Sequence, residues 1–137
     1  MVTAGYSGTP LLKKLGVTPV MKVLVLHAPA AYFQWLQADI SKQFVTGKQV
    51  PDFIHLFAAD KVSFEKEMKR ILPLCKQNSN MITWVSWYKK SAGIKTDITE
   101  DTIRNFALQH GLVDIKVCAV SEQWSGLKLV VPLAKRK

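Results

Sequence analysis

The sequence predicts a three-layer α/β protein whose sheet is mostly parallel and ends in an antiparallel hairpin. Three short apolar runs rich in β-branched or aromatic residues, 22–27, 52–58 and 82–87, are separated by helical patterns. Strands that alternate with helices pair in parallel and are covered on both faces. Two further strand patterns, 112–120 and 127–131, are joined without a helix, and so short a connection forces antiparallel pairing.

We expect the run 82–87 to be a central strand, because it is too short for a helix and has polar residues on both sides. Ligands of parallel sheets collect at the carboxyl ends of the strands, so the loop 87–96 is the expected binding region. Lysine ammoniums and hydroxyl groups there suit phosphate or carboxylate oxygens. The candidate residues of this loop are Lys89, Lys90, Ser91 and Thr96.

Length and composition predict one globular domain. The chain has 137 residues, of which 48% are hydrophobic, and no repeat or flexible linker divides it. We expect an N-terminal arm with a short helix over 1–21, the α/β core over 22–131 and a basic tail over 132–137.

The formal charge of +9 favours anionic partners, although the lysines are spread along the chain and only 135–137 form a block. Cys75 and Cys118 lie far apart without metal-ligand spacing, so we expect free thiols and neither a metal site nor a disulfide.

The first ten residues do not resemble a secretion signal, and the apolar stretch 23–36 is interrupted and short. These features predict a soluble, cytoplasmic protein without a membrane partner.

The N-terminal segment predicts a two-turn helix that buries Leu11, Leu12 and Leu15. Thr9 is the expected cap, Pro10 suits the first helical position, and Gly16 suits the end. A weaker alternative is an anion site at the start of this helix. Its residues would be Ser7, Gly8 and Thr9.

His27 ends the first strand at the expected ligand edge and precedes a helix over 32–38. The turn 28–31 contains no glycine, so we expect no positive φ there and no close approach of a pyrophosphate. A structural role for His27 is favoured over a catalytic one, because no carboxylate or thiol lies near it in sequence. Phe44 and Val45 form a possible short strand, and 46–48 a turn.

Two longer helices are expected. The first begins at a cap formed by Asp60 or Ser63, and Pro73 ends or kinks it. Its apolar residues recur at helical spacing and should be buried: Phe64, Met68, Ile71, Leu72 and Cys75. A carboxylate at a strand end also suits ligand binding, so Asp60 is a candidate site residue as well. The spacing of 97–100 predicts a capping box for the second helix, which Gly111 ends. Trp124 is expected in a loop, as a lid over the core.

The order of elements resembles that of class I S-adenosylmethionine-dependent methyltransferases, shortened in its second quarter, with a Rossmann-like core and the closing hairpin of that family. The resemblance is one of topology, since the glycine-rich loop that this family keeps after its first strand is absent from 27–32. It implies a divergent methyltransferase, with S-adenosylmethionine as a possible cofactor. His27, Asp60 and Lys89 lie at the ends of three different predicted strands, so we expect them to meet at the carboxyl edge as its binding or acid–base groups.

A closer likeness covers nearly the whole chain. The segments that carry it are 6–11 with 13–16, 84–87 with 89–90, 96–97, 113–120 and 124–130, which include YSGTPL, WVSW and WSGLKLV, while Tyr88 stands where that pattern has a proline. They look like the signatures of a family of small bacterial proteins known only as a domain of unknown function. This likeness implies a bacterial protein and no particular activity.

Three functions therefore compete. The favoured one is a non-enzymatic binding module for a small anionic ligand, and the divergent methyltransferase is the alternative. Nucleic-acid binding is disfavoured, because Trp84 and Trp87 lie three residues apart on one strand and face opposite sides of the sheet. The protein is expected to be a monomer, or a homodimer through an exposed last strand at the sheet edge.

Overall fold

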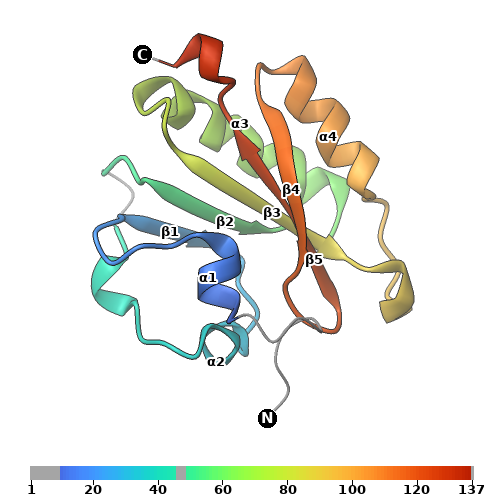
Figure 1. The fold of residues 1–137 in the computed structure, drawn as a ribbon. Coiled ribbons are helices and arrows are strands. Elements are labelled where there is room, and N and C mark those ends of the chain that lie inside the picture. The colour runs from blue at the N-terminus through green and yellow to red at the C-terminus, as the bar shows by residue number, and fades with distance from the viewer. Residues whose placement is uncertain (1–9, 46–48, 137) are drawn as a thin grey trace.

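The computed structural model describes residues 10–45 and 49–136 and contains one five-stranded sheet. The strands are β1 (Val23–Leu26), β2 (Phe53–Phe57), β3 (Ile82–Tyr88), β4 (Val113–Ala119) and β5 (Trp124–Val130). Their spatial order is β1-β2-β3-β5-β4 (Figure 1). The first three strands pair in parallel, whereas β5 runs antiparallel to both β3 and β4. The mostly parallel sheet, its central strand and its closing hairpin are therefore confirmed.

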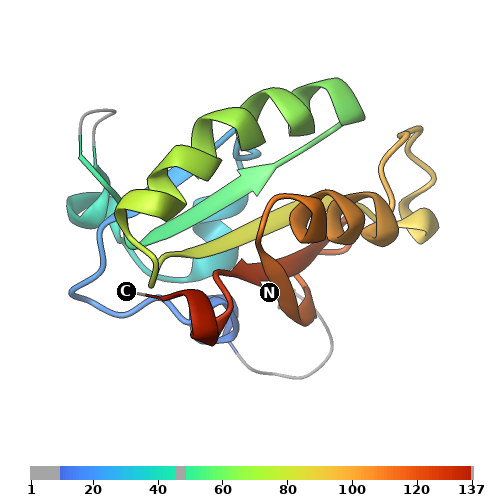
Figure 2. The same ribbon diagram turned by 90° about the horizontal axis from the view of Figure 1, so that it is seen from above.

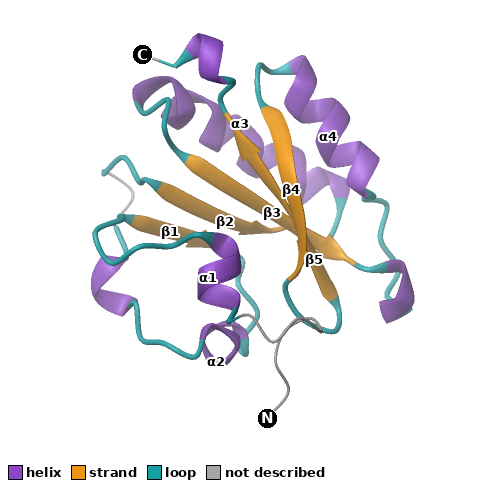
Figure 3. Cartoon of the chain, viewed as in Figure 1, coloured by secondary structure: helices purple, strands orange, loops and turns teal. Residues whose placement is uncertain are grey.

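The helices cover both faces of the sheet. They are α1 (Leu11–Leu15), α2 (Tyr32–Leu36), α3 (Lys61–Gln77) and α4 (Glu100–Gln109), with short 3-10 turns at Ser41–Gln43, Lys90–Ala92 and Leu133–Lys135. Figure 2 shows α3 and α4 on one side of the sheet, and α1 and α2 on the other. Figure 3 shows how the strands form the middle layer between these helices. The three-layer arrangement is thus confirmed.

Each face of the sheet has its own core. Ile54, Leu56 and Val85 point toward α3 and α4, where Phe64, Met68 and Ile71 pack on them. Side chains in a strand alternate between faces, so Phe53, Phe57 and Trp84 point the other way and pack against Leu11, Tyr32 and Leu36 of α1 and α2. Trp84 and Trp87 belong to different cores, as expected.

Two details of the longer helices differ from expectation. The helix α3 continues through Pro73 to Gln77, because Ile71 and Cys75 on either side of the proline are buried in the core and hold the last turns in place. The capping box of α4 uses Thr99 and Thr102. Asp97 instead accepts a hydrogen bond from the N–H of Lys61, 2.7 Å away, at the start of α3.

The start of β5 and the position of the hairpin in the sheet also differ from the sequence-based expectation. Trp124 is the first residue of β5 and is buried, so it is a strand residue that closes the core from the α1 side. β5 lies inside the sheet, and β4 forms the free edge, so the expected exposed last strand is wrong. The register shifts between Asp114 and Lys116, which interrupts the alternation of side chains along β4.

The connection from β1 to β2 contains a trace of a sixth strand. Phe44 forms a single parallel bridge with Val23, and the N–H of Val45 donates to the Val23 carbonyl at 3.0 Å. Because β2 lies on the other side of β1, this bridge extends the sheet at its outer edge. The predicted short strand is thus present as one bridge, and the predicted turn over 46–48 lies outside the described residues.

Candidate functional site

Two cavities lie at the carboxyl edge of the parallel strands. The first has a volume of about 310 Å³ and takes its walls from the ends of all three strands. The second, of about 640 Å³, lies along the loop that joins β3 to α4. Tyr88, the last residue of β3, lines both cavities. One ligand can therefore contact residues of both.

Aromatic rings form much of the first cavity. The rings of Tyr88 and Trp124 are tilted by 30° to each other, with centroids 4.1 Å apart, and Phe57 meets Trp124 edge to face at 5.1 Å. Phe57 and Trp124 are buried in the core beneath α1 and α2, so the cavity has rigid walls. Such rings suit a flat ligand group.

His27 lies at the mouth of this cavity in a strained conformation. Its φ is +58°, in the left-handed region that favours glycine, and it stands one residue before the turn 28–31, in which no residue takes a positive φ, as expected. Nε2–H of His27 donates to Oε2 of Glu67 on α3 at 2.7 Å. The imidazole is 59% exposed, whereas the Glu67 side chain is 10% exposed. The fold therefore supplies the carboxylate partner that the sequence neighbours of His27 lack.

A buried hydrogen-bonded chain supports the floor of the cavity. The Tyr32 hydroxyl lies 2.9 Å from Nδ1 of His55, and Nε2 of His55 lies 2.7 Å from the Ser86 hydroxyl. The His55 ring also stacks on Phe57 at 4.3 Å. Burial lowers the pKa of His55 to about 3, so the ring is neutral and holds one donor and one acceptor. All three polar side chains are fully buried, which indicates a supporting role rather than contact with a ligand.

Sequence reasoning missed this chain, although one signal was available. His55 stands between apolar residues in the middle of a buried strand, and a buried imidazole needs hydrogen-bond partners. The partners themselves lie on α2 and β3, 23 and 31 residues away. Only the tertiary structure identifies them.

Lysines dominate one wall of the second cavity. Lys89, Lys90 and Lys95 line it, and the backbone N–H of Lys89 is fixed by the Gln123 carbonyl at 2.8 Å. Glu100 and Asp101 stand on the wall formed by α4. Both carboxylates bond to the Arg104 guanidinium, whose Nη1 donates to Asp101 at 2.8 Å. The wall next to Tyr88 is therefore the cationic one.

The other predicted site residues lie around this edge. Thr96 lines the second cavity, but its hydroxyl donates to the Ala59 carbonyl at 2.8 Å. Asp60 caps α3 by accepting from the Ser63 N–H at 2.8 Å, and these Ser63 hydrogen bonds lower the pKa of its carboxyl. Ser91 is exposed in the 3-10 turn after β3 and does not line either cavity. Ser7, Gly8 and Thr9 lie outside the described residues.

A third cavity, of about 410 Å³, lies at the opposite edge of the sheet near the ends of α3 and α4. Leu72, Leu112 and Val131 give it a mainly apolar lining. Cys75 also lines it, but burial raises the pKa of this thiol to about 11, so it is protonated at neutral pH and a poor nucleophile. We therefore do not place the functional site there.

Three further properties of the described residues complete the description of the chain. In the part of the chain that the structure describes, no three His, Cys, Asp or Glu side chains gather as metal ligands would. Across residues 10–45 and 49–136, no helix combines the length and the apolar character needed to cross a bilayer. Cys75 and Cys118 are both free.

The fit of S-adenosylmethionine to this edge is poor. The turn 28–31 carries side chains where this cofactor's usual loop has glycines, and the His27 imidazole stands at the mouth of the first cavity. Between β1 and β2, the described residues add to the sheet one parallel bridge, from Phe44 to Val23.

Comparison with known proteins shows the fold and no activity. No protein-family model matches the chain, and no curated protein matches it either. A Sulfolobus solfataricus protein assigned as a type 11 methyltransferase superposes with a TM-score of 0.51 at 13% identity over 85% of this chain and 88% of that one. A Streptococcus agalactiae protein of the NADB-Rossmann superfamily superposes with a TM-score of 0.47 at 8% identity, over 95% of this chain and 70% of that one. The sheet topology and the likeness to the Sulfolobus protein therefore show a Rossmann-like α/β fold.

Proposed function

We propose that the chain is a binding module for a small anion that carries a flat ring. The observation that carries this proposal is that Tyr88 lines both an aromatic cavity and a lysine-lined cavity at the carboxyl edge. The ring would lie beside Tyr88 and Trp124, and the anionic group would meet Lys89 and Lys90. Lysine binds phosphate or carboxylate as a point charge and does not require a glycine loop.

The proposal involves no catalytic step. Tyr32, His55 and Ser86 lie beneath the cavity and are fully buried, and Asp60 and Thr96 already serve backbone groups. Membership of the small bacterial family that the sequence motifs resemble is compatible with a binding role and remains part of this proposal.

A thermal-shift experiment with three probes tests the proposal. Adenosine 5′-monophosphate has both a ring and an anion, whereas adenosine and inorganic phosphate each have one of the two. We expect the monophosphate to raise Tm more than either part at equal concentration, because a ligand that binds the native state stabilises it in proportion to its affinity.

Matched variants assign the effect to the lysines. The double variant Lys89→Ala with Lys90→Ala should lose most of the rise in Tm, and Lys66→Ala with Lys69→Ala on the exposed side of α3 should keep it. An equal rise in the wild type and in the Lys89 and Lys90 variant would contradict the proposal. So would equal shifts with adenosine and with its monophosphate.

The fold favours one second candidate, a divergent methyltransferase that uses His27, Asp60 and Lys89. It is supported by the likeness to the Sulfolobus protein and by the left-handed residue after β1. Calorimetric titration with S-adenosylmethionine separates the candidates. Saturable binding would favour the enzyme, and its absence up to millimolar concentration would remove this candidate.

A further inference from the structure

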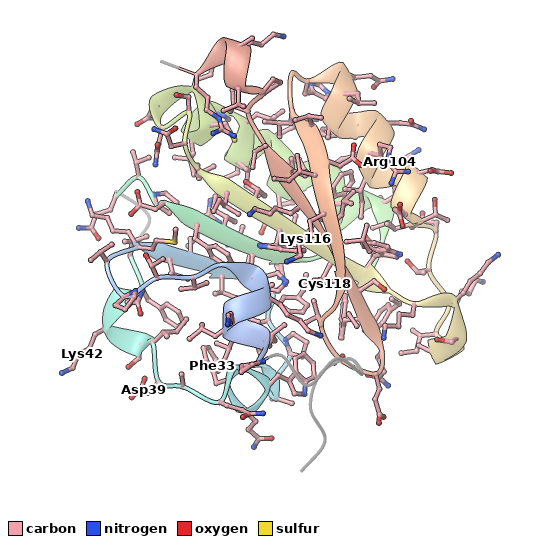
Figure 4. The ribbon with its side chains drawn as sticks, viewed as in Figure 1. Phe33, Asp39, Lys42, Arg104, Lys116 and Cys118 are labelled. Carbon is pink, nitrogen blue, oxygen red and sulfur yellow. The ribbon has the colours of Figure 1, made fainter. Side chains whose placement is uncertain are left out.

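The described residues leave the middle of the β4–β5 hairpin exposed. The core under α1 and α2 contains residues of β1, β2 and β3 and also Val120 and Trp124 at the turn of the hairpin, with Cys118 packed against it, whereas residues 115–117 of β4 are exposed. Lys116 lies at the middle of this exposed edge strand, and Cys118 follows it (Figure 4). The hairpin therefore presents side chains to solvent on the side that carries α1.

Two lysines lie directly opposite each other on this face. Lys116 pairs with Lys128 in the register of β4 and β5, and Lys128 pairs with Trp84 on β3. Opposite residues of paired strands share a face, so both lysines lie on the face of Trp84, which belongs to the α1 core. Like charges directly opposite in a sheet are destabilising, so this pair has a cost in the isolated protein.

Other positively charged side chains lie near Lys116 and Lys128. The pKa of Lys128 is held below its usual value by partial burial first, and then by the charges of Lys116 and Arg136. Lys14, Lys116 and Lys89 all act on the Cys118 thiol, where they partly offset the effect of burial on its pKa. A positive surface therefore continues from the hairpin toward α1 and the end of β3.

Carboxylates do not neutralise this face. The single acidic residue of the two strands, Asp114, accepts a hydrogen bond at 2.9 Å from Nε of Arg104, which lies on α4 on the other side of the sheet. Within residues 10–45 and 49–136, no ion pair joins Lys116, Lys128 or Arg136 to a carboxylate. Nε of Arg136 donates to the Val131 carbonyl at 2.9 Å.

We propose that this face of the hairpin binds the phosphate backbone of double-stranded nucleic acid through Lys116, Lys128 and Arg136. A chain of phosphates places successive negative charges against several cations at once, which suits the net charge of +9. The cations stand on an open sheet face and line neither cavity of the carboxyl edge, which favours an extended polyanion over a small ligand. Trp84 and Trp124 are buried, so this face has no tryptophan on which a single strand can stack.

Fluorescence anisotropy with a labelled 20-base-pair DNA duplex tests the proposal. The variant Lys116→Gln with Lys128→Gln should bind about tenfold or more weakly at low salt, and the slope of log K against log salt should become shallower by roughly 2. The control Lys66→Gln with Lys69→Gln removes the same charge from α3 on the opposite face and should bind nearly as the wild type does. The hairpin variant should keep or raise Tm without DNA, because a repulsion is removed.

Three results would overturn the proposal. Equal weakening by the hairpin and control variants would show that only net charge matters. Tighter binding of a single strand than of the duplex would rule out the assigned partner. Binding to vesicles of phosphatidylcholine with phosphatidylserine, together with no binding to the duplex, would assign the face to anionic lipid.

Discussion

The two faces of the sheet are stabilised in different ways. The core under α3 and α4 is almost entirely apolar and lies under helices of 17 and 10 residues. The core under α1 and α2 lies under helices of only 5 residues each and contains more rings. It also buries polar atoms, since Nε1–H of Trp84 donates to the Leu15 carbonyl at 2.8 Å and Tyr32 bonds to His55.

This difference has a physical basis. Helices as short as α1 and α2 are unstable alone, so directed hydrogen bonds and ring contacts hold them to the sheet. Phe57 and Trp124 of this core also line the cavity at the carboxyl edge. The comparison suggests that the α3 face supplies most of the apolar stability, whereas the α1 face gives the candidate site its rigid shape.

The largest expected effect belongs to the apolar face. Phe64→Ala removes a fully buried ring from α3 and should lower the free energy of unfolding by about 3 to 5 kcal/mol. Urea denaturation measures this loss. A cost below about 1 kcal/mol would mean that the α3 face does not carry the apolar stability assigned to it.

The hydrogen-bonded face should respond to loss of a single oxygen atom. Tyr32→Phe leaves Nδ1 of His55 without its partner in a buried site, so the free energy of unfolding should fall by about 1 to 3 kcal/mol. Tyr88→Phe is the matched control, because the Tyr88 hydroxyl has no hydrogen bond to any residue of 10–45 or 49–136 and its ring contact with Trp124 is kept. Equal costs for the two changes would contradict the supporting role of the chain.

The features of these two faces that the sequence predicts are those set by residues close together in the chain. The strands and α3 are governed by local periodicity, so their positions could be predicted within a few residues. The Tyr32–His55–Ser86 chain, the His27–Glu67 bond and the cap from Asp97 to Lys61 join residues 23 to 40 positions apart. Local patterns carry no information on such pairings. Lys89 and Lys90 could be found because they directly follow a recognisable strand.

The pH dependence of stability should also distinguish the two faces of the sheet, because His55 lies on the α1 face. The pKa of His55 is lowered to about 3 in the fold, so only the unfolded chain takes up its proton between about pH 6.5 and pH 3. This contribution to stability is complete above pH 6.5 and is lost as pH falls. From pH 7 to pH 5 the loss should be about 2 kcal/mol.

The variant His55→Gln isolates this effect from the carboxylates, which also titrate in acid. Denaturation at several pH values should show a shallower fall for the variant than for the wild type. Identical pH profiles would mean that His55 is not held neutral in the folded protein.

The smallest expected effect concerns the strained turn at the cavity mouth. His27→Ala and His27→Gly both remove the bond to Glu67, but only glycine adopts a φ of +58° without strain. The glycine variant should therefore be more stable than the alanine variant by about 1 kcal/mol. Chemical denaturation compares them, and an alanine variant as stable as the glycine one would contradict the observed backbone conformation.

Amide chemical-shift mapping with adenosine 5′-monophosphate tests the central claim most directly. A binding site at the carboxyl edge predicts saturable shifts at Tyr88, Lys89, Lys90 and Trp124, with much smaller shifts along β4. Inorganic phosphate alone should perturb Lys89 and Lys90 and leave Trp124 unchanged. Shifts confined to Lys116 and Lys128, or no saturable shift at the carboxyl edge, would contradict the account.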